Sequence, residues 1–497
     1  MTPEFSVVIP TIGRESLQRL LTALQATPDP APRTVVIVDD RPGDGSPIPI
    51  DTTLPVHVLR SGGRGPAAAR NVGWRAVQTP WVAFLDDDVI PAPGWLAALV
   101  ADLTAADDCG AVGSQGIIEV PRPTSRRSTD DERRTEALAG AQWITADMAY
   151  RRTALVAAGG FDERFPRAYR EDADLALRIT EAGHQIVPGA RRCTHPVAPA
   201  TLLSSVRVQV GNRDNALMRR KHGPYWRSRI GEGRGRLRGH AATTAAGLVA
   251  LGGLLIRRRG IAASAAALWA GLTADFAARR FRQGPHTVEQ LGRMVVTSAL
   301  IPPVAVAHRL IGEWAFRSAR RDPPLAVLLD RDDTIIVDGP YLNDPAGVRP
   351  IPGAARALRQ LRDHGLLLAV VTNQSGVAKG LISPEQLEAV NARVDAMLGP
   401  FDSWQVCVHD AAEGCACRKP EPGMVLAAAE SLGVEASRCV LIGDTGGDVD
   451  AALAARARAV LVPTDRTLRH EITEARSRAA VAPSLEHAVA LVLRECR

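Results

Sequence analysis

The chain has 497 residues, of which 46% are hydrophobic and 23% charged, and its mean hydropathy is near zero. This ordinary globular composition excludes a disordered chain, a collagen-like chain and a polytopic membrane protein. Seven cysteines are too few for a small scaffold held together by disulfides. At roughly 150 residues per domain, the length predicts about three domains.

The net charge of +6 is unevenly distributed along the chain. Residues 201–325 contain 21 lysines and arginines against 6 acidic residues, a local charge of +15, so the remainder carries −9. A basic segment within an acidic chain predicts an anionic partner. The segment lacks interleaved aromatic residues, so nucleic acid is not expected to be that partner.

From residue 1 to about 225, apolar strands alternate with amphipathic helices. The predicted strands are Phe5–Ile9, Thr34–Val38 and Trp81–Leu85, and the predicted helices are Ser16–Leu24 and Gly94–Leu103. This alternation predicts an α/β domain with a mostly parallel sheet. No secretory pattern opens the chain, so we expect the N-terminus in the cytoplasm.

Two of these strands end in clustered carboxylates. Asp39 and Asp40 follow one strand, and three consecutive residues, Asp86, Asp87 and Asp88, follow another. The carboxyl ends of neighbouring parallel strands form the crevice in which open α/β sheets bind ligands. Crowded carboxylates favour a bound Mg²⁺ or Mn²⁺, which can bridge to a diphosphate. A solvated acidic turn is the alternative, and it explains one cluster better than two.

Residues 1–225 resemble a family 2 glycosyltransferase with a nucleotide-diphospho-sugar-binding, GT-A-like fold. The matching segments are SVVIPTIGR (6–14), VVIVDD (35–40), GPAAARNVGW (65–74), FLDDDVIPAPGW (84–95), AYRRTALVAAGGFDERF (149–165) and REDADLALRI (170–179). The resemblance implies a nucleotide-sugar donor, a glycan or lipid-linked acceptor, and inversion at the anomeric carbon.

The resemblance also implies a role for each matching residue. Asp39 and Asp40 would face the donor nucleoside, and Arg70 would support its diphosphate. Asp86 and Asp88 form the DxD pair, in which Asp86 faces the donor and Asp88 is the direct ligand of Mg²⁺ or Mn²⁺. Asp172, in the Glu-Asp motif, would be the general base on the acceptor hydroxyl.

Residues 226–323 form a basic, apolar and helical connector. Its uncharged runs are Ala241–Ile256, Gly260–Ala274 and Met294–Ala307, and arginines flank them. None of the runs reaches the roughly 18–20 apolar residues that span a bilayer. We therefore expect a segment that lies on an anionic membrane surface, peripheral at the inner face of the cell membrane. A hairpin packed on the preceding domain and a true membrane span are the alternatives.

The α/β pattern restarts at residue 324. Predicted strands are Leu325–Leu329, Leu366–Val371 and Cys439–Ile442, and predicted helices are Ala354–His364 and Pro384–Leu398. The strand ends deliver carboxylates, a threonine and backbone N–H groups, and one lysine lies downstream. Together these groups predict phosphoryl transfer without a Walker-type loop. The residues concerned are Asp330, Asp332, Thr372, Lys419 and Asp444.

These motifs, in this order over residues 324–497, resemble the haloacid dehalogenase superfamily of phosphatases, with a Rossmann-like fold. The resemblance implies that Asp330 is the nucleophile that becomes aspartyl-phosphate, and that Asp332 is the general acid and base. Thr372, Asn373 and Lys419 would bind the phosphoryl group. Mg²⁺ would be held by Asp330, by Asp332 through its backbone carbonyl, and by Asp444.

A compact cluster of thiols and one imidazole lies within this domain. Cys407, His409, Cys415 and Cys417 supply three thiolates and one nitrogen, the ligand set of a closed structural Zn²⁺ site. Redox pairing of the cysteines is the alternative. The four other cysteines are scattered along the chain.

The cysteine loop and the segment TNQSGVAKG (372–380) resemble one subgroup of the superfamily. It contains D-glycero-D-manno-heptose 1,7-bisphosphate 7-phosphatases and histidinol-phosphate phosphatase domains. It implies that Arg418 and Lys379 contact a sugar phosphate, with no large cap domain. Two residues depart from the pattern, because Asp333 replaces a glycine and Thr445 replaces a basic residue.

The sequence therefore predicts a bifunctional enzyme, a metal-dependent inverting glycosyltransferase (1–225) joined by a connector (226–323) to a phosphatase (324–497). Heptose supply to glycan or glycolipid synthesis explains such a fusion better than histidine synthesis does. The alternatives are a phosphatase for histidinol phosphate or another small phosphomonoester, and a membrane-recruited docking protein with a vestigial phosphatase.

Overall fold

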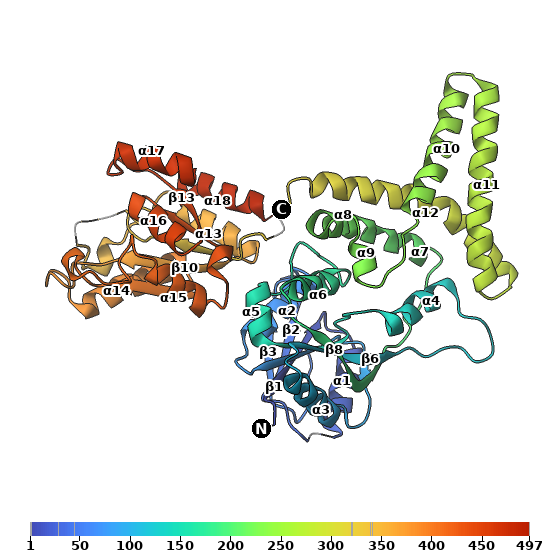
Figure 1. Ribbon diagram of the computed structural model, residues 1–497, viewed down its shortest axis with the longest axis horizontal. Coiled ribbons are helices and arrows are strands. Elements are labelled where there is room, and N and C mark those ends of the chain that lie inside the picture. The colour runs from blue at the N-terminus through green and yellow to red at the C-terminus, as the bar shows by residue number, and fades with distance from the viewer. Residues whose placement is uncertain are drawn as a thin grey trace. The chain divides into compact units, whose positions relative to one another are not determined.

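The computed structural model describes residues 2–27, 29–43, 45–319, 322–337, 339 and 341–496 (Figure 1). The chain divides into two compact units, Met1–Arg317 and Ser318–Arg497. Over the described residues, the first unit contains an eight-stranded sheet and the second a six-stranded sheet. The domain boundaries predicted at residues 225 and 323 stay predictions.

The first unit begins with strands and helices that alternate along the chain. The strands are β1 (Phe5–Thr11), β2 (Val35–Asp39), β3 (Val56–Arg60), β4 (Trp81–Leu85), β5 (Ile90–Pro91), β6 (Gly113–Glu119), β7 (Asp147–Arg151) and β8 (Ile186–Thr194). The helices are α1 (Ser16–Gln25), α2 (Pro66–Arg75), α3 (Trp95–Asp108), α4 (Asp130–Glu136), the 3-10 turn η1 (Ala137–Gly140), α5 (Arg152–Ala158), α6 (Glu171–Glu181), α7 (Ser204–Arg207), the 3-10 turn η2 (Val208–Val210), α8 (Gly211–His222) and α9 (Trp226–Arg229).

The sheet has the strand order β3-β2-β1-β4-β7-β6-β8-β5. Its first four strands pair in parallel, whereas β7 runs antiparallel to both β4 and β6. The predicted strands at β1, β2 and β4 are confirmed. The expectation of a mostly parallel sheet holds for the first four strands, and the other half of the sheet is mixed.

Both faces of this sheet are covered, so β1, β2 and β4 are buried at every position and mostly apolar rather than alternating. In β1, Val7 and Ile9 pack on the face that carries α1 and α3. Val8, between them, points to the opposite face, where α2, α5 and α6 pack. The carboxyl ends of β1, β2 and β4 therefore open at one edge of the sheet, between these layers.

Three long helices complete the first unit: α10 (Leu237–Leu255), α11 (Arg259–Gln283) and α12 (Val288–Ala315). In Figure 1, α10 and α11 form a hairpin that projects from the unit, and α12 runs beside α8. Ion pairs join both α11, through Arg280, and α12, through Arg293, to α4. Arg280 Nη2 lies 2.7 Å from Asp130 Oδ2, and Arg293 pairs with Asp131.

The helices are longer than the uncharged runs suggested. By length and composition alone, α11 (25 residues, mean hydropathy 1.4) and α12 (28 residues, mean hydropathy 1.6) could each cross a membrane. In these two helices, 22% and 33% of the most apolar stretch is buried within the protein. The expectation that this segment is too short to span a bilayer is therefore wrong for α11 and α12 by length and composition.

The second unit has strands β9 (Ala326–Leu329), β10 (Leu367–Asn373), β11 (Ser403–Cys407), β12 (Cys439–Gly443), β13 (Arg458–Leu461) and β14 (Ala480–Val481). Its helices are α13 (Ala354–Asp363), α14 (Pro384–Leu398), α15 (Gly423–Ser431), α16 (Gly446–Ala454), α17 (Arg469–Arg478) and α18 (Leu485–Glu495), with 3-10 turns η3 (Pro345–Gly347), η4 (Ala411–Glu413) and η5 (Ala436–Arg438). The predicted strands at β9, β10 and β12 are confirmed.

The sheet of the second unit is parallel throughout, in the order β11-β10-β9-β12-β13-β14. Apolar cores lie on both of its faces. Between β9 and α13, the described residues form only η3 and isolated bridge pairs. No cap domain is inserted there, in agreement with the sequence.

Candidate active sites

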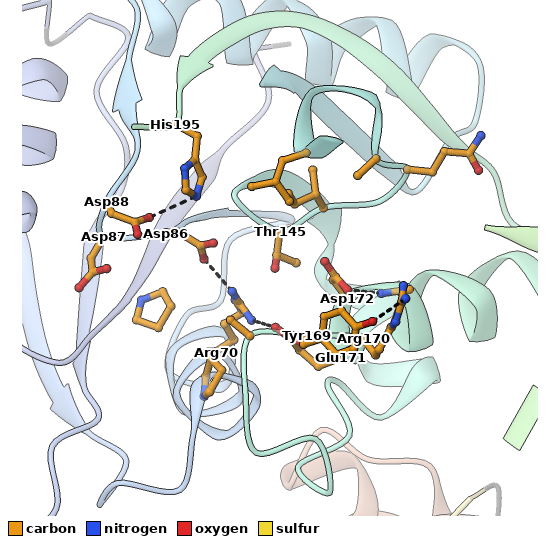
Figure 2. Close-up of a pocket in the computed structure, with 18 of the residues that line it drawn as sticks. Arg70, Asp86, Asp87, Asp88, Thr145, Tyr169, Arg170, Glu171, Asp172 and His195 are labelled. Atoms are coloured by element: carbon orange, nitrogen blue, oxygen red, sulfur yellow. Dashed lines mark hydrogen bonds and ion pairs between the residues drawn. The ribbon is translucent and has the colours of Figure 1, made fainter. Parts of the chain in front are cut away.

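A cavity of about 750 Å³ lies in the first unit, where β1, β2 and β4 end and α6 begins. Five of the predicted residues line it together: Asp40, Arg70, Asp86, Asp88 and Asp172. Figure 2 shows Asp88 at one end of the cavity, Asp172 toward the other, and Arg70 between them. The fold therefore joins motifs that are up to 132 positions apart in the chain.

Asp39 does not line this cavity. Its carboxylate accepts hydrogen bonds from Arg41, with Nε 2.9 Å from Oδ1 and Nη2 2.7 Å from Oδ2, and these bonds lower the pKa of Asp39. Asp40 accepts from the hydroxyl of Ser61 (2.7 Å) and from the N–H of Gly65 (3.0 Å). Gly65 has φ +98°, and a Cβ there would lie 2.8 Å from the carbonyl oxygen of Pro166. Asp40 therefore orients the turn that starts α2.

The three consecutive aspartates have different partners. Asp87 is buried and accepts from the Thr11 hydroxyl (2.7 Å), and burial raises its pKa. Arg14 Nη1 lies 3.0 Å from both Asp87 Oδ1 and Asp88 Oδ2. The second oxygen of Asp88 faces His195 Nε2 at 3.7 Å (Figure 2).

His195 was not predicted from the sequence. It follows β8, and its Nδ1 lies 2.9 Å from the carbonyl oxygen of Pro196, an arrangement that places the proton on Nδ1 and leaves the Nε2 lone pair toward Asp88. A carboxylate oxygen and an imidazole nitrogen this close fit a divalent cation such as Mn²⁺. The only signal in the sequence was a histidine after a strand.

Arg70 connects the two ends of the cavity. Its guanidinium is 1% exposed and lies 2.7 Å from both Asp86 Oδ1 and Glu171 Oε1. Glu171 is equally buried, and burial, together with the charge of the adjacent Asp172, raises its pKa to about 8. Arg70 thus holds Asp86 through Oδ1, whereas Asp88 Oδ1 faces the imidazole of His195, so Asp88 is the acid with a second metal-binding group beside it.

Asp172 lies in the first turn of α6. The residue before the helix, Arg170, has φ +82°, a strained conformation of the kind that concentrates at functional sites. The N–H of Ala173 donates a hydrogen bond to Asp172 Oδ1 (2.6 Å). Burial raises the pKa of Asp172, as a general base that works near neutral pH requires.

In the second unit, predicted residues meet where β9, β10 and β12 end. Lys419 Nζ lies 2.6 Å from Asp330 Oδ1, 2.6 Å from Asp448 Oδ1 and 2.9 Å from the carbonyl oxygen of Val371. Carboxylate oxygens of Asp330, Asp444 and Asp448 lie within 4.8 Å of one another.

Three buried carboxylates beside one lysine leave an excess of negative charge. Burial raises the pKa of Asp330 to about 8 against the opposing charge of Lys419, and burial with the charge of Asp448 raises that of Asp444 to about 7. A divalent cation among these oxygens would keep them ionised, so the donor set fits Mg²⁺. A Cβ at residue 443 would collide with the Asp448 carboxylate at 2.2 Å, so Gly443 makes room for it.

Asp332 is held by neighbours that sequence reasoning missed. Arg331, 1% exposed, donates from Nε to Asp332 Oδ1 (3.0 Å) and from Nη1 to Asn391 (2.7 Å). Gln374 donates to Asp332 Oδ2 (2.7 Å) and to the hydroxyl of Thr372 (2.8 Å). Thr372 and Asp332 are therefore joined through one amide.

The other residues that were expected to contact phosphate are Asn373, Arg418 and Lys379, and each of them has a partner within the protein. Asn373 exchanges two 3.1 Å hydrogen bonds with the backbone of Lys419, so it holds the strand end against the lysine. Arg418 donates to the carbonyl oxygen of His409 (3.2 Å). Lys379 is exposed and lies 3.5 Å from Asp410.

The two departures from the phosphatase pattern have physical explanations. Asp333 has φ +53°, in the left-handed region where a glycine is favoured and where aspartate is tolerated better than most residues. Arg466 Nη1 lies 3.3 Å from Asp333 Oδ2, so the extra acid faces a base. Thr445 and Asp448 form a capping box that starts α16.

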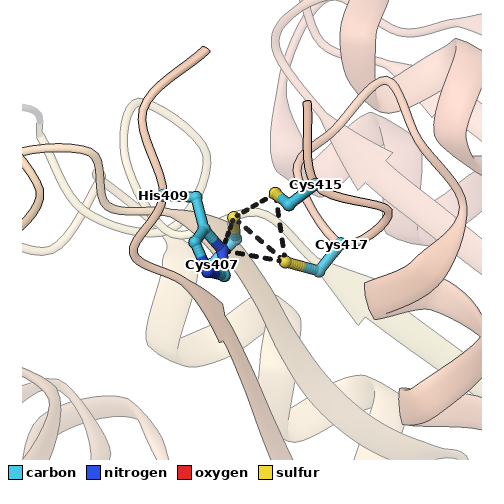
Figure 3. Close-up of side chains that lie close together, drawn as sticks. All are labelled: Cys407, His409, Cys415 and Cys417. Carbon is cyan, nitrogen blue, oxygen red and sulfur yellow. Dashed lines mark hydrogen bonds between the residues drawn. The ribbon is translucent and has the colours of Figure 1, made fainter. Parts of the chain in front are cut away.

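The four predicted zinc ligands converge in the second unit (Figure 3). Their sulfurs lie 3.3–3.7 Å apart, and His409 Nδ1 lies 3.3 Å from the sulfur of Cys417. Zinc–sulfur bonds of about 2.3 Å at tetrahedral angles would separate two sulfurs by about 3.8 Å. Three thiols and one imidazole at this spacing fit a tetrahedral metal site.

Comparison with known proteins agrees with both sites. Residues 6–157 match the family model described as glycosyl transferase family 2, and residues 416–488 match the model described as HAD-hydrolase-like. The D-glycero-beta-D-manno-heptose-1,7-bisphosphate 7-phosphatase of Pseudomonas putida is 40% identical over 156 residues, which cover 30% of this chain and 89% of that protein. The chain belongs to the family of this phosphatase, and its residues 6–157 are similar to family 2 glycosyltransferases.

Two further proteins are similar to the phosphatase unit. The enzyme of the same name from Pseudomonas aeruginosa is 37% identical over 148 residues, which cover 29% of this chain and 83% of that protein. A solved structure of D,D-heptose 1.7-bisphosphate phosphatase from B. bronchiseptica, complexed with magnesium and phosphate, is 29% identical. It covers 34% of this chain and 99% of its own, with a TM-score of 0.31.

The family 2 glycosyltransferase unit thus contains the cavity with Asp88 and Asp172, and the haloacid dehalogenase unit contains Asp330 and Lys419. The chain is an enzyme with a transferase unit and a phosphomonoester hydrolase unit.

Proposed function

We propose that the phosphatase unit removes the 7-phosphate of D-glycero-D-manno-heptose 1,7-bisphosphate, and that the transferase unit adds a sugar from a nucleotide donor in the same glycan or glycolipid pathway. The observation that carries the phosphatase assignment is the 40% identity to an enzyme of that name across 89% of its length. The complete set of catalytic residues at the carboxyl ends of β9, β10 and β12 supports it, namely Asp330, Asp332, Thr372, Lys419 and Asp444.

A substrate comparison tests this assignment. We expect the full chain to release phosphate from heptose 1,7-bisphosphate with a kcat/KM at least about tenfold higher than from histidinol phosphate, because a pocket with fixed polar contacts discriminates by more than 1.4 kcal/mol. Phosphate release is measured for both substrates in parallel. A preference for histidinol phosphate would contradict the heptose proposal.

Each residue of the phosphatase site has its own role in the reaction. Asp330 attacks phosphorus, and Asp332 donates a proton to the departing sugar oxygen. Thr372 and Lys419 bind the transferred phosphoryl oxygens. Water then hydrolyses the aspartyl-phosphate while Asp332 accepts its proton. Asp330 and Asp444, with the backbone carbonyl of Asp332, would hold Mg²⁺, which supplies positive charge to the phosphoryl group.

In the transferase unit, Asp172 removes the proton from the acceptor hydroxyl. The oxygen then attacks the anomeric carbon opposite the departing nucleoside diphosphate, and the configuration inverts. Asp88 and His195 would hold Mg²⁺ or Mn²⁺, which supplies positive charge to the diphosphate. Arg70 keeps Asp86 and Glu171 in place between these two ends.

We also propose that Cys407, His409, Cys415 and Cys417 bind a structural Zn²⁺. The four ligands leave no open coordination position, which is typical of a structural rather than a catalytic site. The metal would fix the loop after β11 that leads to Arg418 and Lys419.

The connector is proposed to bind an anionic membrane surface from the cytoplasmic side. At the tip of the α10–α11 hairpin, Leu255 is 84% and Ile256 69% exposed. Arg257, Arg258 and Arg259 follow immediately and are exposed, with no acidic partner among the described residues. Apolar side chains beside a cluster of arginines suit the interface of an anionic lipid surface.

A flotation experiment tests this attachment. We expect the full chain to float with phosphatidylglycerol vesicles at low salt and not with phosphatidylcholine vesicles, because each basic residue near an anionic surface contributes about 1 kcal/mol. Replacement of Arg257, Arg258 and Arg259 by glutamine should reduce binding by at least about tenfold. Equal flotation with both lipids would contradict an electrostatic attachment, and resistance to alkaline extraction from cell membranes would show a spanning segment instead.

A further inference from the structure

A second cavity, of about 1360 Å³, adjoins the transferase cavity within the first unit. The two cavities share a wall made by η1, Tyr169, Arg170 and Glu232. This wall lies beside Asp172, whereas Asp88 and His195 line only the first cavity. A molecule in the second cavity would therefore approach the general base from the side away from the proposed metal and donor diphosphate.

The lining of the second cavity is strongly basic. Among the described residues, it contains nine arginines and one glutamate: Arg134, Arg167, Arg170, Arg219, Arg227, Arg234, Arg236, Arg238, Arg309 and Glu232. His240 adds a titratable nitrogen. Such a lining favours an anionic occupant next to those arginines that have no acidic partner.

Six of these nine arginines already have acidic partners. Arg134 lies 3.1 Å from Asp131, and Arg219 and Arg309 both face Glu313, at 3.4 Å and 2.6 Å. Arg167 forms a bidentate pair with Asp214 (2.7 Å), and Glu232 accepts from both Arg170 and Arg227. These pairs shape the wall, and they leave the opposite side of the cavity with unbalanced charge.

The unbalanced charge is on the segment that leads into α10. Arg234, Arg236 and Arg238 line the cavity, are exposed, and have no acidic partner within the described part of the chain. Arg236 stacks over the ring of Phe276 at 5.4 Å, which fixes its position without neutralising it. Planar guanidinium groups bind phosphate oxygens in pairs, and three of them on one short segment match one phosphate or diphosphate group.

We propose that this cavity binds the phosphate or diphosphate group of the sugar acceptor, so that the transferase acts on a phosphorylated acceptor. This inference rests on the proposed glycosyl transfer. The acceptor phosphate lies among Arg234, Arg236 and Arg238 while its hydroxyl reaches Asp172. The hydroxyl proton passes to Asp172, a carbon–oxygen bond forms at the anomeric carbon, and the bond to the nucleoside diphosphate breaks.

The acceptor phosphate has two possible sources, a lipid phosphate and a soluble phosphorylated glycan. The same segment begins α10, which carries exposed apolar side chains such as Leu248 (64%), Leu251 (60%) and Leu254 (62%). The two sources share the phosphate chemistry and differ in the alkyl chain, so a pair of probes separates them.

Equilibrium binding of decyl phosphate, below its micelle concentration, tests the proposal in the full chain. All proteins carry Asp330→Asn so that the phosphatase unit does not hydrolyse the probe. The test variant is R234Q/R236Q/R238Q, and the matched control is R359Q/R393Q/R476Q, which removes the same charge from exposed arginines of the second unit that line neither cavity. Any binding at the phosphatase site is the same in both variants.

We expect the control to bind decyl phosphate within about twofold of the parent, and the test variant to bind at least about tenfold more weakly at the second site. Decanol, which lacks the phosphate, should not bind there. Equal binding of decyl phosphate by the two variants would overturn the proposal, as would equal binding of decanol and decyl phosphate.

Mannose 6-phosphate is the second probe. Binding of decyl phosphate alone assigns the cavity to a lipid phosphate, and arginine-dependent binding of both probes assigns it to a soluble phosphorylated acceptor. No donor is present, so the result does not depend on turnover. Sugar transfer without arginine-dependent binding would overturn only this inference, and arginine-dependent binding without any sugar transfer would overturn only the proposed transferase activity.

Discussion

Replacement of Asp330 by asparagine is expected to reduce phosphate release by at least about 10³-fold, because the amide cannot form the aspartyl-phosphate bond. The substitution also removes one of three buried carboxylates that crowd around Lys419. We therefore expect the melting temperature of the protein to stay the same or to rise, since the like-charge repulsion falls. Phosphate release and thermal unfolding are measured on the same preparation.

Asp363→Asn is the matched control for this variant. It makes the same chemical change at an exposed position at the end of α13, and it should leave phosphate release within about twofold. If the parent chain and Asp330→Asn released phosphate equally slowly, the phosphatase unit would be vestigial. A docking role for this unit would then be favoured over catalysis.

Replacement of Asp172 by asparagine is expected to reduce sugar transfer by about 10²–10⁴-fold, the usual contribution of a general base. The asparagine keeps the size of the side chain at the start of α6, and it removes a carboxylate whose pKa is raised by burial. Folding should therefore be preserved. Transfer is measured with a panel of nucleotide sugars, and phosphate release by the other unit serves as an internal standard.

Asp108→Asn, on the exposed end of α3, is the control for this second variant. It should transfer sugar at the parental rate. Nucleoside diphosphate binding by Asp172→Asn should also be unchanged, because the proposed metal and diphosphate lie at the Asp88 end of the cavity. Full turnover by Asp172→Asn would show that another group removes the acceptor proton.

The catalytic strands could be predicted because each combines two local signals. An uninterrupted apolar run fits a strand covered on both faces, as in β4 and β9, and the carboxylates that follow mark its end. The sequence order of the motifs was enough to place Asp330 near Lys419 and Asp86 near Arg70. Their individual partners depend on side-chain packing, which a linear pattern does not contain.

The site residues that the sequence did not predict are brought into place by long-range contacts. His195 meets Asp88, and Arg331 meets Asn391, only after distant segments pack together. The lengths of the connector helices were underestimated for a different reason, because only the uncharged runs between arginines were counted. Arg280 instead remains inside α11 because Asp130 and the hydroxyls of Thr297 and Ser298 satisfy it.

Tertiary contacts also accommodate the prolines of the connector inside a helix. Pro302 and Pro303 lie inside α12, although proline removes a helical hydrogen bond and usually kinks or ends a helix. Pro302 is buried, and α12 packs closely on α8, where a Cβ at Gly312 would lie 2.6 Å from the carbonyl oxygen of Arg213. Tertiary packing therefore maintains a helix that local propensity disfavours.

The buried guanidinium of Arg70 also limits how the transferase site can change in evolution. Arg70 reaches Asp86 through Nη2 and Glu171 through Nη1, and a lysine would replace this fixed fork by a single nitrogen, so one of the two acids would lose its partner in this geometry. An uncompensated buried carboxylate costs several kcal/mol, a large part of the stability of a typical domain. A lineage that loses this arginine must therefore replace one of the two acids as well, and the three positions should covary among relatives.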